Sequence, residues 1–172
     1  MPQPFAPPVE LVPTIKLFCS PSNPRHNDAS VPHCAALTTA DLEALCAEDV
    51  PWTFRDEPHV YRAVALDRVL SHCGFDEGPG GRSIPPTERR PAWRQIVIAR
   101  ASDVVVAVFT CAEFMPQMGR TRTFVAWAVD GRALPTDEGP VRIVVASDLK
   151  GSRSLRQVVE VRVVDVREVE AR

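Results

Sequence analysis

The chain is built from short runs of apolar, mostly β-branched residues that are separated by turn-forming residues. Runs of this kind are typical of strands, whereas an amphipathic helix needs apolar residues at every third or fourth position over a longer stretch. The predicted strands are Val50 to Phe54, His59 to Ala63, Gln95 to Ala99, Val104 to Phe109, Thr121 to Val129, Val141 to Ala146 and Val158 to Val166. Because strands outnumber helices and do not alternate regularly with them, the predicted class is α+β, with mixed, mostly antiparallel β-sheets and a few short helices.

Two of these strand regions allow a finer prediction. Gln95 to Ala99 and Val104 to Phe109 are expected to form two buried strands of one hairpin. In the run from Val158 to Val166, valines alternate with Glu160 and Arg162, which predicts one buried face and one wet face.

Two short helices are marked by their apolar spacing. Thr38-x-x-Asp41 resembles a capping box in which Asp replaces Glu, so the first helix is expected to begin there. Gly74 is expected to end the second helix. The apolar positions are Leu42, Leu45 and Cys46 in the first helix and Leu66, Val69, Leu70 and Cys73 in the second.

Twelve of the seventeen prolines lie before residue 33 or between Gly78 and Pro91, which predicts loops in both stretches. Residues Glu10 to Cys19 could form one strand, and Pro13 restricts that strand to the edge of a sheet. The expected organisation is a Pro-rich extension over residues 1–34 with this edge strand, one domain over residues 35–166, and a tail over residues 167–172.

Charge and hydropathy argue against several classes of protein. The formal net charge of −2 provides no field that would favour nucleic acid or an anionic membrane. No run reaches the roughly 18 apolar residues of a membrane span, and the first residues lack the basic and apolar regions of a signal peptide. Five cysteines at irregular spacing argue against a complete disulfide framework. We therefore expect a cytoplasmic protein, or a periplasmic one if a leader has been removed.

Three segments, in a fixed order and at similar spacing, carry a resemblance to a known family. The first is Leu37 to Leu45 followed by Pro51-Trp52-Thr53, and the second is Tyr61-Arg-Ala-Val-Ala-Leu66 followed by Leu70 and Gly74. The third joins Asp130-Gly-Arg-Ala-Leu-Pro135, Glu138-Gly-Pro-Val-Arg-Ile-Val-Val145 and Gly151-Ser-Arg-Ser-Leu-Arg156. Together they resemble the molybdopterin-binding domain of sulfite-oxidase-type enzymes over roughly three-quarters of the chain, which is the size of a whole domain. The resemblance implies that family's fold and its molybdenum cofactor.

One glycine-flanked basic stretch is the candidate cofactor site. Glycine lets backbone N–H groups approach a phosphate, and arginine offers a planar fork that matches the phosphate oxygens. By the resemblance, Arg153 matches the arginine and Arg156 the lysine of the stretch G-A-R-x-V-K, which contacts the pterin in the family. Lys150, Gly151 and Ser152 complete the candidate set. The residue types alone leave a solvated basic loop open as the alternative.

The cysteine that binds molybdenum in this family has no counterpart at the matching position. A soft thiolate suits that metal, and the resemblance places it between Val50 and Tyr61, where this chain has no cysteine. No metal ligand is therefore assigned. Cys111, where the chain leaves an apolar run, is the candidate reactive thiol, with a place in the core as the alternative. Cys46 and Cys73 lie on the apolar faces of the predicted helices and are expected to be buried.

Other candidate residues have simpler structural interpretations. The cysteines and histidines near the N-terminus lack the spacing of a compact metal site, although export would allow a disulfide between the two cysteines. His59 and His72 are candidate bases, and His72 is near a helix end. The three tryptophans suit core or boundary positions, and Asp103 and Asp137 suit turns. These residues are Cys19, His26, His33 and Cys34; His59 and His72; Trp52, Trp93 and Trp127; Asp103 and Asp137.

Three functions are compatible with these observations. The first is a small molybdopterin-dependent oxidoreductase, or a subunit of one, with a redox partner. The second is a non-catalytic binding module on the same scaffold, whose cleft takes another anionic ligand or a protein partner. The third is an interaction subunit that docks through its Pro-rich N-terminus. Substrate and oligomeric state stay open.

Overall fold

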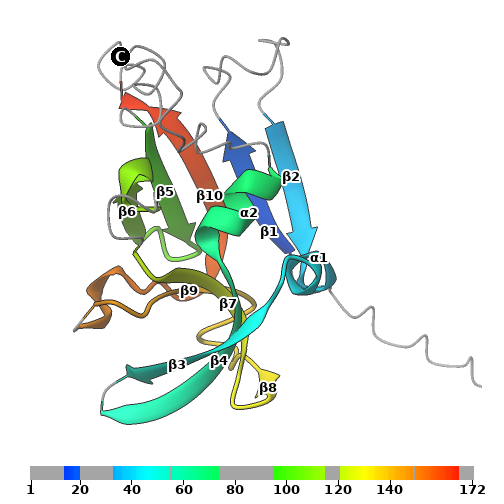
Figure 1. Ribbon diagram of the computed structural model, residues 1–172, viewed down its shortest axis with the longest axis vertical. Coiled ribbons are helices and arrows are strands. Elements are labelled where there is room, and N and C mark those ends of the chain that lie inside the picture. Colours follow the sequence, from blue (N-terminus) through cyan, green and yellow to red (C-terminus); the bar gives the residue numbers. More distant parts are fainter. Residues whose placement is uncertain are drawn as a thin grey trace, which may run out of the picture.

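The computed structural model describes residues 14–19, 33–54, 56–73, 95–114, 121–148 and 150–166. The predictions for the two Pro-rich loops, for Gly74 and Trp93, and for the tail 167–172 lie outside the described residues. Two β-sheets and a few short helices make up the described fold (Figure 1). The prediction of mostly antiparallel sheets with few, short helices is confirmed.

Sheet A has the strand order β2-β1-β10-β5-β6. Its strands are β1 (Thr14–Cys19), β2 (His33–Thr38), β5 (Gln95–Ala101), β6 (Val106–Thr110) and β10 (Val158–Asp165). β1 runs parallel to β10, and the other neighbouring strands are antiparallel. The predicted edge position of the first strand is wrong, because β1 has β2 on one side and β10 on the other. The described strand, Thr14–Cys19, contains no proline, so each of its residues has an N–H that can pair with a neighbouring strand.

Sheet B has the strand order β3-β4-β7-β8, and β9 also pairs with β7. Its strands are β3 (Glu48–Phe54), β4 (Glu57–Ala65), β7 (Thr123–Val129), β8 (Arg132–Ala133) and β9 (Arg142–Val145). All of these pairings are antiparallel. The β3–β4 hairpin extends away from sheet A (Figure 1).

Helix α1 (Thr39–Ala44) begins at the predicted capping box. The Asp41 carboxylate accepts a hydrogen bond from the Thr38 N–H at 2.8 Å, and Thr38 Oγ1 accepts one from the Asp41 N–H at 3.3 Å. Leu42 is fully buried, as its spacing predicts. Cys46 is exposed, and its predicted burial is wrong, because the helix ends at Ala44 and Cys46 lies in a turn with a φ of 60°.

Helix α2 (Leu66–His72) carries the predicted apolar stripe, with Leu66, Val69 and Leu70 buried. Cys73, at its C-terminal cap, is half-buried rather than buried. No helix in the described ranges has both the length and the apolar character that crossing a membrane would need.

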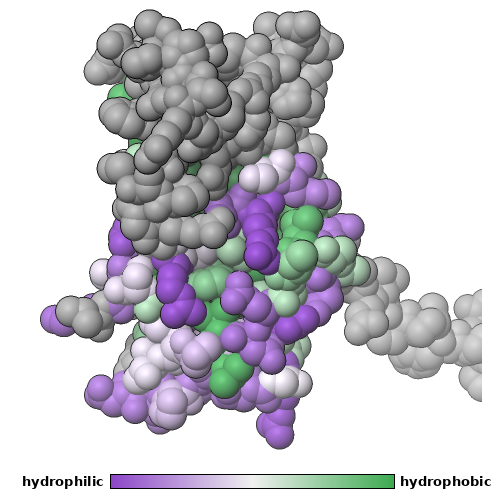
Figure 2. All heavy atoms as spheres, viewed as in Figure 1, coloured by the Kyte–Doolittle hydropathy of each residue, from purple (hydrophilic) through white to green (hydrophobic). Residues whose placement is uncertain are grey.

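Two clusters of buried side chains lie on the faces of the sheets. The larger one joins sheet A to α2 and to one face of sheet B, where β7 contributes Val125 and β9 contributes Ile143. The smaller one lies on the opposite face of sheet B and consists of Val50, Trp52, Tyr61, Ala63, Phe124, Ala126 and Val144. Sheet B is therefore buried on both faces at β7 and β9, whereas β3 and the first half of β4 have one exposed face. Among the described atoms on the face seen in Figure 2, hydrophilic residues predominate and hydrophobic ones form small groups between them.

The β5–β6 hairpin is confirmed, but β6 is not a buried strand. Ala107 and Phe109 face the core, while Val106 and Val108 are 47% and 51% exposed. In the described fold β6 is the last strand of sheet A, and its side chains alternate between the core and an exposed face.

The wet face predicted for β10 is also only partly correct. Arg162 is exposed, but Glu160 is only 7% exposed. The Glu160 carboxylate accepts hydrogen bonds from Arg100 and Arg162, at 2.6 and 2.7 Å for the closest pairs. Two flanking guanidinium groups thus cover and neutralise this carboxylate.

Candidate functional site

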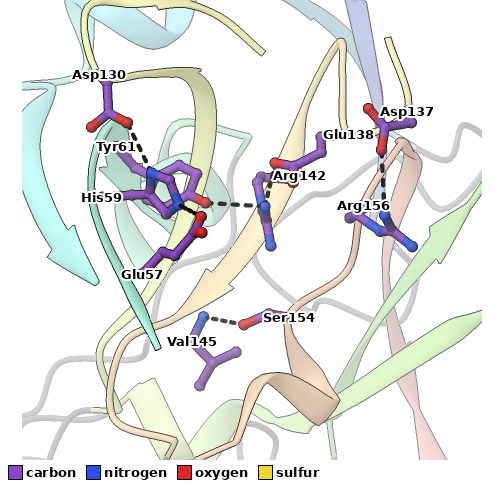
Figure 3. Close-up of polar contacts among 10 residues, drawn as sticks. All are labelled: Glu57, His59, Tyr61, Asp130, Asp137, Glu138, Arg142, Val145, Ser154 and Arg156. Carbon is purple, nitrogen blue, oxygen red and sulfur yellow. Dashed lines mark hydrogen bonds and ion pairs between the residues drawn. The ribbon is translucent and has the colours of Figure 1, made fainter. Parts of the chain in front are cut away.

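The predicted cofactor stretch follows β9 and is held against it. The Ile143 N–H donates to the Leu155 carbonyl at 2.8 Å, and the Leu155 N–H donates back to the Ile143 carbonyl at 3.0 Å. The Val145 N–H donates to Ser154 Oγ at 3.0 Å (Figure 3). These bonds hold residues 154 and 155 beside β9 and so position the short 3₁₀ turn η3 (Gly151–Arg153), which directly precedes them.

Gly151 lies against two aromatic side chains of β3. A Cβ atom at this position would be 3.4 Å from both the Trp52 and the Phe54 ring, which is ordinary van der Waals contact. The glycine therefore lies beside aromatic carbon. This is not the open space that a phosphate group would need next to its backbone.

Arg153 is bound by two carboxylates of the chain. Its Nε and Nη2 donate to Asp148 at 2.9 and 2.7 Å, and its Nη1 donates to Glu113 at 2.8 Å. The guanidinium also lies 5.5 Å from the centre of the Phe109 ring. The hydrogen bonds with Asp148, and then that with Glu113, raise the pKa of Arg153 above its ordinary value. Burial opposes ionisation of Glu113, but hydrogen bonds from the Thr110 N–H and from Arg153 outweigh it and lower the pKa of that carboxyl.

This arrangement does not fit the phosphate-binding role predicted for Arg153. Three of its N–H groups already donate to carboxylates, and the two negative charges exceed its single positive charge. A phosphate at this position would compete for the same donors and be repelled by both Asp148 and Glu113. The residues around Arg153 therefore do not fit the anionic end of molybdopterin.

The other predicted residues do not converge on Arg153. Lys150 and Ser152 are exposed. Arg156 is half exposed, and its Nη1 lies 3.6 Å from Asp137, a residue of the predicted turn (Figure 3). The two arginines matched by the resemblance thus have different carboxylate partners and share no ligand-like position.

Arg142, whose residue type and position did not predict a functional role, lies in the interior beside this stretch. It is only 1% exposed. Its guanidinium carbon lies 5.3, 5.4 and 5.1 Å from the ring centres of Trp52, Phe54 and Tyr61. Its Nη1 pairs with Glu138 and donates to Tyr61 Oη at 3.2 Å (Figure 3), while its Nε has no acceptor among the described residues.

The cage around Arg142 has the composition of a cation site that its own side chain fills. Three aromatic faces attract the guanidinium electrostatically, and one carboxylate balances its charge. Burial raises the pKa of Tyr61, so its hydroxyl stays neutral and continues to accept from Arg142. One signal in the sequence pointed to this cage: a cation within the apolar run Val141 to Ala146, four residues after Glu138.

His59 and Asp130 form a second polar pair at the end of the β4–β7 pairing. Asp130 Oδ2 lies 2.8 Å from His59 Nδ1 (Figure 3). Asp130 Oδ1 accepts a hydrogen bond from the Val60 N–H at 2.9 Å. The Asp130 pKa is lowered, first by the bond with His59 and then by that with Val60. His59 Nε2 lies 3.8 Å from Glu57. With its Nδ1 side bound to the turn aspartate, His59 anchors the Asp130-Gly131 turn to β4.

Cys111, the candidate reactive thiol, begins the 3₁₀ turn η1 (Cys111–Phe114) and is fully buried. Reactive thiols need access to solvent or substrate, so this position supports the core alternative. In the described part of the chain, no group of three or more histidine, cysteine or acidic side chains has a geometry that would hold a metal ion. The side chains of Cys19, His26, His33 and Cys34 lie outside the described residues, although the backbone register pairs Cys19 with His33 and Phe18 with Cys34.

Comparison of the chain with models of known protein families gives no match, and comparison with curated proteins gives no significant relative.

Proposed function

We propose that this chain is a non-catalytic binding module that recognises another polypeptide, on a scaffold similar to the molybdopterin-binding domain of sulfite-oxidase-type enzymes. The observation that carries the proposal is a group of exposed valines, Val104, Val105, Val106 and Val108, which we call the valine hairpin. They are 74%, 53%, 47% and 51% exposed and account for four of the six large hydrophobic residues exposed in the described chain. Clustered exposed apolar residues mark interaction sites, whereas single ones are common on any surface.

The polar groups near η3 support the same proposal because their hydrogen bonds are made to one another. The Arg153–Asp148–Glu113 network joins η3 to η1 and to the turn after β9, and the caged Arg142 joins β9 to β4. They leave few charged donors for an anionic ligand. An interaction role needs only an exposed surface on a rigid support, and β6 has that support in β5 and the core beneath it.

Site-specific photo-crosslinking tests recognition of a polypeptide. A photoreactive amino acid replaces Val105 in the valine hairpin, and a matched variant carries it at Val60, which is 45% exposed on β4. We expect one discrete adduct with a polypeptide, another copy of the chain included, from position 105 and none from position 60. Equal adducts from both positions, or none from either, would contradict the proposal.

Metal and pterin analysis tests the competing enzymatic function. The protein is produced in a host that makes the molybdenum cofactor and is assayed for molybdenum and for the fluorescent pterin oxidation product. We expect both to be far below one per chain. Stoichiometric molybdenum, reduced by Arg153→Ala but retained in Arg132→Ala, would instead establish a cofactor-binding protein.

A further inference from the structure

Building on the proposed function, we infer that the partner of the valine hairpin is a second copy of this chain, and that two β6 strands pair antiparallel about a two-fold axis near Ala107. The two copies of sheet A would then form one continuous sheet. The inference rests on three features of β6. Two of its residues direct backbone groups away from β5, residues 104–110 carry no charge, and the central sequence Val106-Ala-Val108 reads the same in both directions.

Among the described residues, no strand pairs with β6 on the side away from β5, and two residues with exposed side chains direct their backbone groups to that side. In the described fold, β5 is the strand that pairs with β6. The hairpin closes with the Ala101 N–H donating to the Val105 carbonyl at 2.9 Å. Because hydrogen-bonded and non-bonded pairs alternate in an antiparallel ladder, Ala107 and Phe109 direct their backbone groups to β5. Val106 and Val108 therefore direct theirs to the open edge.

The composition of β6 does not protect this edge. Natural edge strands usually carry a lysine, a proline or a bulge that blocks pairing with another strand. Residues 104–110 read Val-Val-Val-Ala-Val-Phe-Thr, with no charge and no proline, and the five β5–β6 pairs run without a register shift. Arg100, the cation opposite Val106 in β5, is paired at 2.6 Å with Glu160, a carboxylate that it shares with Arg162.

A second copy of β6 that runs antiparallel to the first could pair with this edge through both its backbone groups and its side chains. With the two-fold axis at Ala107, Val106 of one copy lies opposite Val108 of the other. Both residues of that pair have outward backbone groups, so each pair can exchange two N–H···O=C bonds. Their exposed side chains fall on the same face and form β-branched cross-strand pairs, which stabilise sheets. No like charges meet across the axis, because residues 104–110 carry none.

The test measures self-association by light scattering and sedimentation from about 1 μM to about 1 mM, a range that covers weak dimers. The full chain is compared with Val108→Lys, which places a charge on the edge. Val60→Lys, at a similarly exposed valine of sheet B, is the matched control. We expect a monomer–dimer equilibrium in the parent chain, at least about a tenfold weaker dimer in Val108→Lys, and an unchanged dimer in Val60→Lys.

A second variant and a second measurement keep the inference testable if Val108→Lys fails to fold. Val106→Pro removes an N–H that points to the open edge, so β5–β6 pairing survives while the dimer loses two bonds, one from each copy. Amide exchange at Val106 and Val108 should slow as the concentration of the parent chain rises. A monomer at every concentration, or a dimer insensitive to both edge variants, would overturn the inference. If that monomer still cross-links through position 105 to a different polypeptide, the proposed function stands and the two-fold pairing alone is refuted.

Discussion

Arg142 shows how a charged side chain is tolerated in the interior of this protein. Burying a cation is costly unless a counter-ion and further polar or aromatic contacts replace its water. Here Glu138 supplies the charge, Tyr61 supplies an oxygen, and three rings supply their negative faces. This residue stabilises the aromatic side of sheet B, and its loss would leave Glu138 largely buried without a counter-charge.

Replacing Arg142 with alanine should therefore destabilise the fold strongly. Removing one partner of a buried pair typically costs about 3–5 kcal/mol, and we expect a loss of that size for Arg142→Ala in urea unfolding monitored by tryptophan fluorescence. The control is Arg132→Ala, an exposed arginine of sheet B, for which a change within about 0.5 kcal/mol is expected. Similar small changes in both variants would show that the cage does not stabilise the fold.

The capping box is the local contact that begins α1, a helix of six residues. Thr38→Ala should lower the free energy of unfolding by about 1 kcal/mol, because the side-chain acceptor for the Asp41 N–H is lost. Thr39→Ala changes the same residue type one position later, outside the cap, and should have a smaller effect. Thermal unfolding by circular dichroism measures both, and equal effects would argue against the cap.

In the turn between β5 and β6, Val104 has a backbone conformation that is unfavourable for valine. Val104 has a φ of 65°, in the left-handed region where a Cβ atom costs roughly 1–2 kcal/mol and where three-residue hairpin loops prefer glycine. We expect Val104→Gly to raise the free energy of unfolding by about 0.5–1 kcal/mol, since the relief of strain exceeds the entropic cost of glycine. Urea denaturation provides the measurement.

Gly131 provides the converse control for this interpretation. It has a φ of 75°, and a Cβ there would meet no atom within 4 Å, so Gly131→Ala introduces backbone strain without a clash. This variant should lose about 1 kcal/mol. If Val104→Gly and Gly131→Ala changed stability in the same direction, backbone strain would not be the cause.

Acid sensitivity belongs to the whole molecule, because lowered carboxyl pKa values are spread over both sheets and α1. Folding lowers the pKa of Asp41, Glu43, Glu113, Asp130 and Glu160. Such groups favour the folded state above their unfolded pKa values, and this contribution is lost as the pH falls through the folded values. We expect urea midpoints to stay level from pH 7 to about pH 5 and to fall below about pH 4.5.

The residue variants Glu113→Gln and Glu160→Gln sharpen this measurement. Both should be less stable than the parent chain at pH 7, because charged hydrogen bonds to Arg153 and Arg100 are weakened. Both should also lose less stability than the parent between pH 5 and pH 3. A parent chain with the same midpoint at pH 3 and pH 7 would contradict the linkage.

The type and position of most elements could be predicted from the sequence alone. β-branched runs predicted β3 to β7, β9 and β10, and the Thr38–Asp41 pair marked the start of α1. The Asp130-Gly131 turn has both residues at positive φ, a conformation that the Asp-Gly dipeptide favours. These features depend on neighbours within a few residues, where side-chain periodicity and turn chemistry act directly.

What each element pairs with was settled by the tertiary structure. Parallel pairing of β1 with β10 joins residues more than 140 positions apart, such as Lys16 and Glu160, and several strand orders would satisfy the same local pattern. The carboxylates that bind Arg153 come from η1 and from the turn after β9. The arginine that was predicted to bind a phosphate therefore forms ion pairs within the fold. A side chain's role depends on the charges packed beside it, and only the long-range pairing of strands brings those charges together.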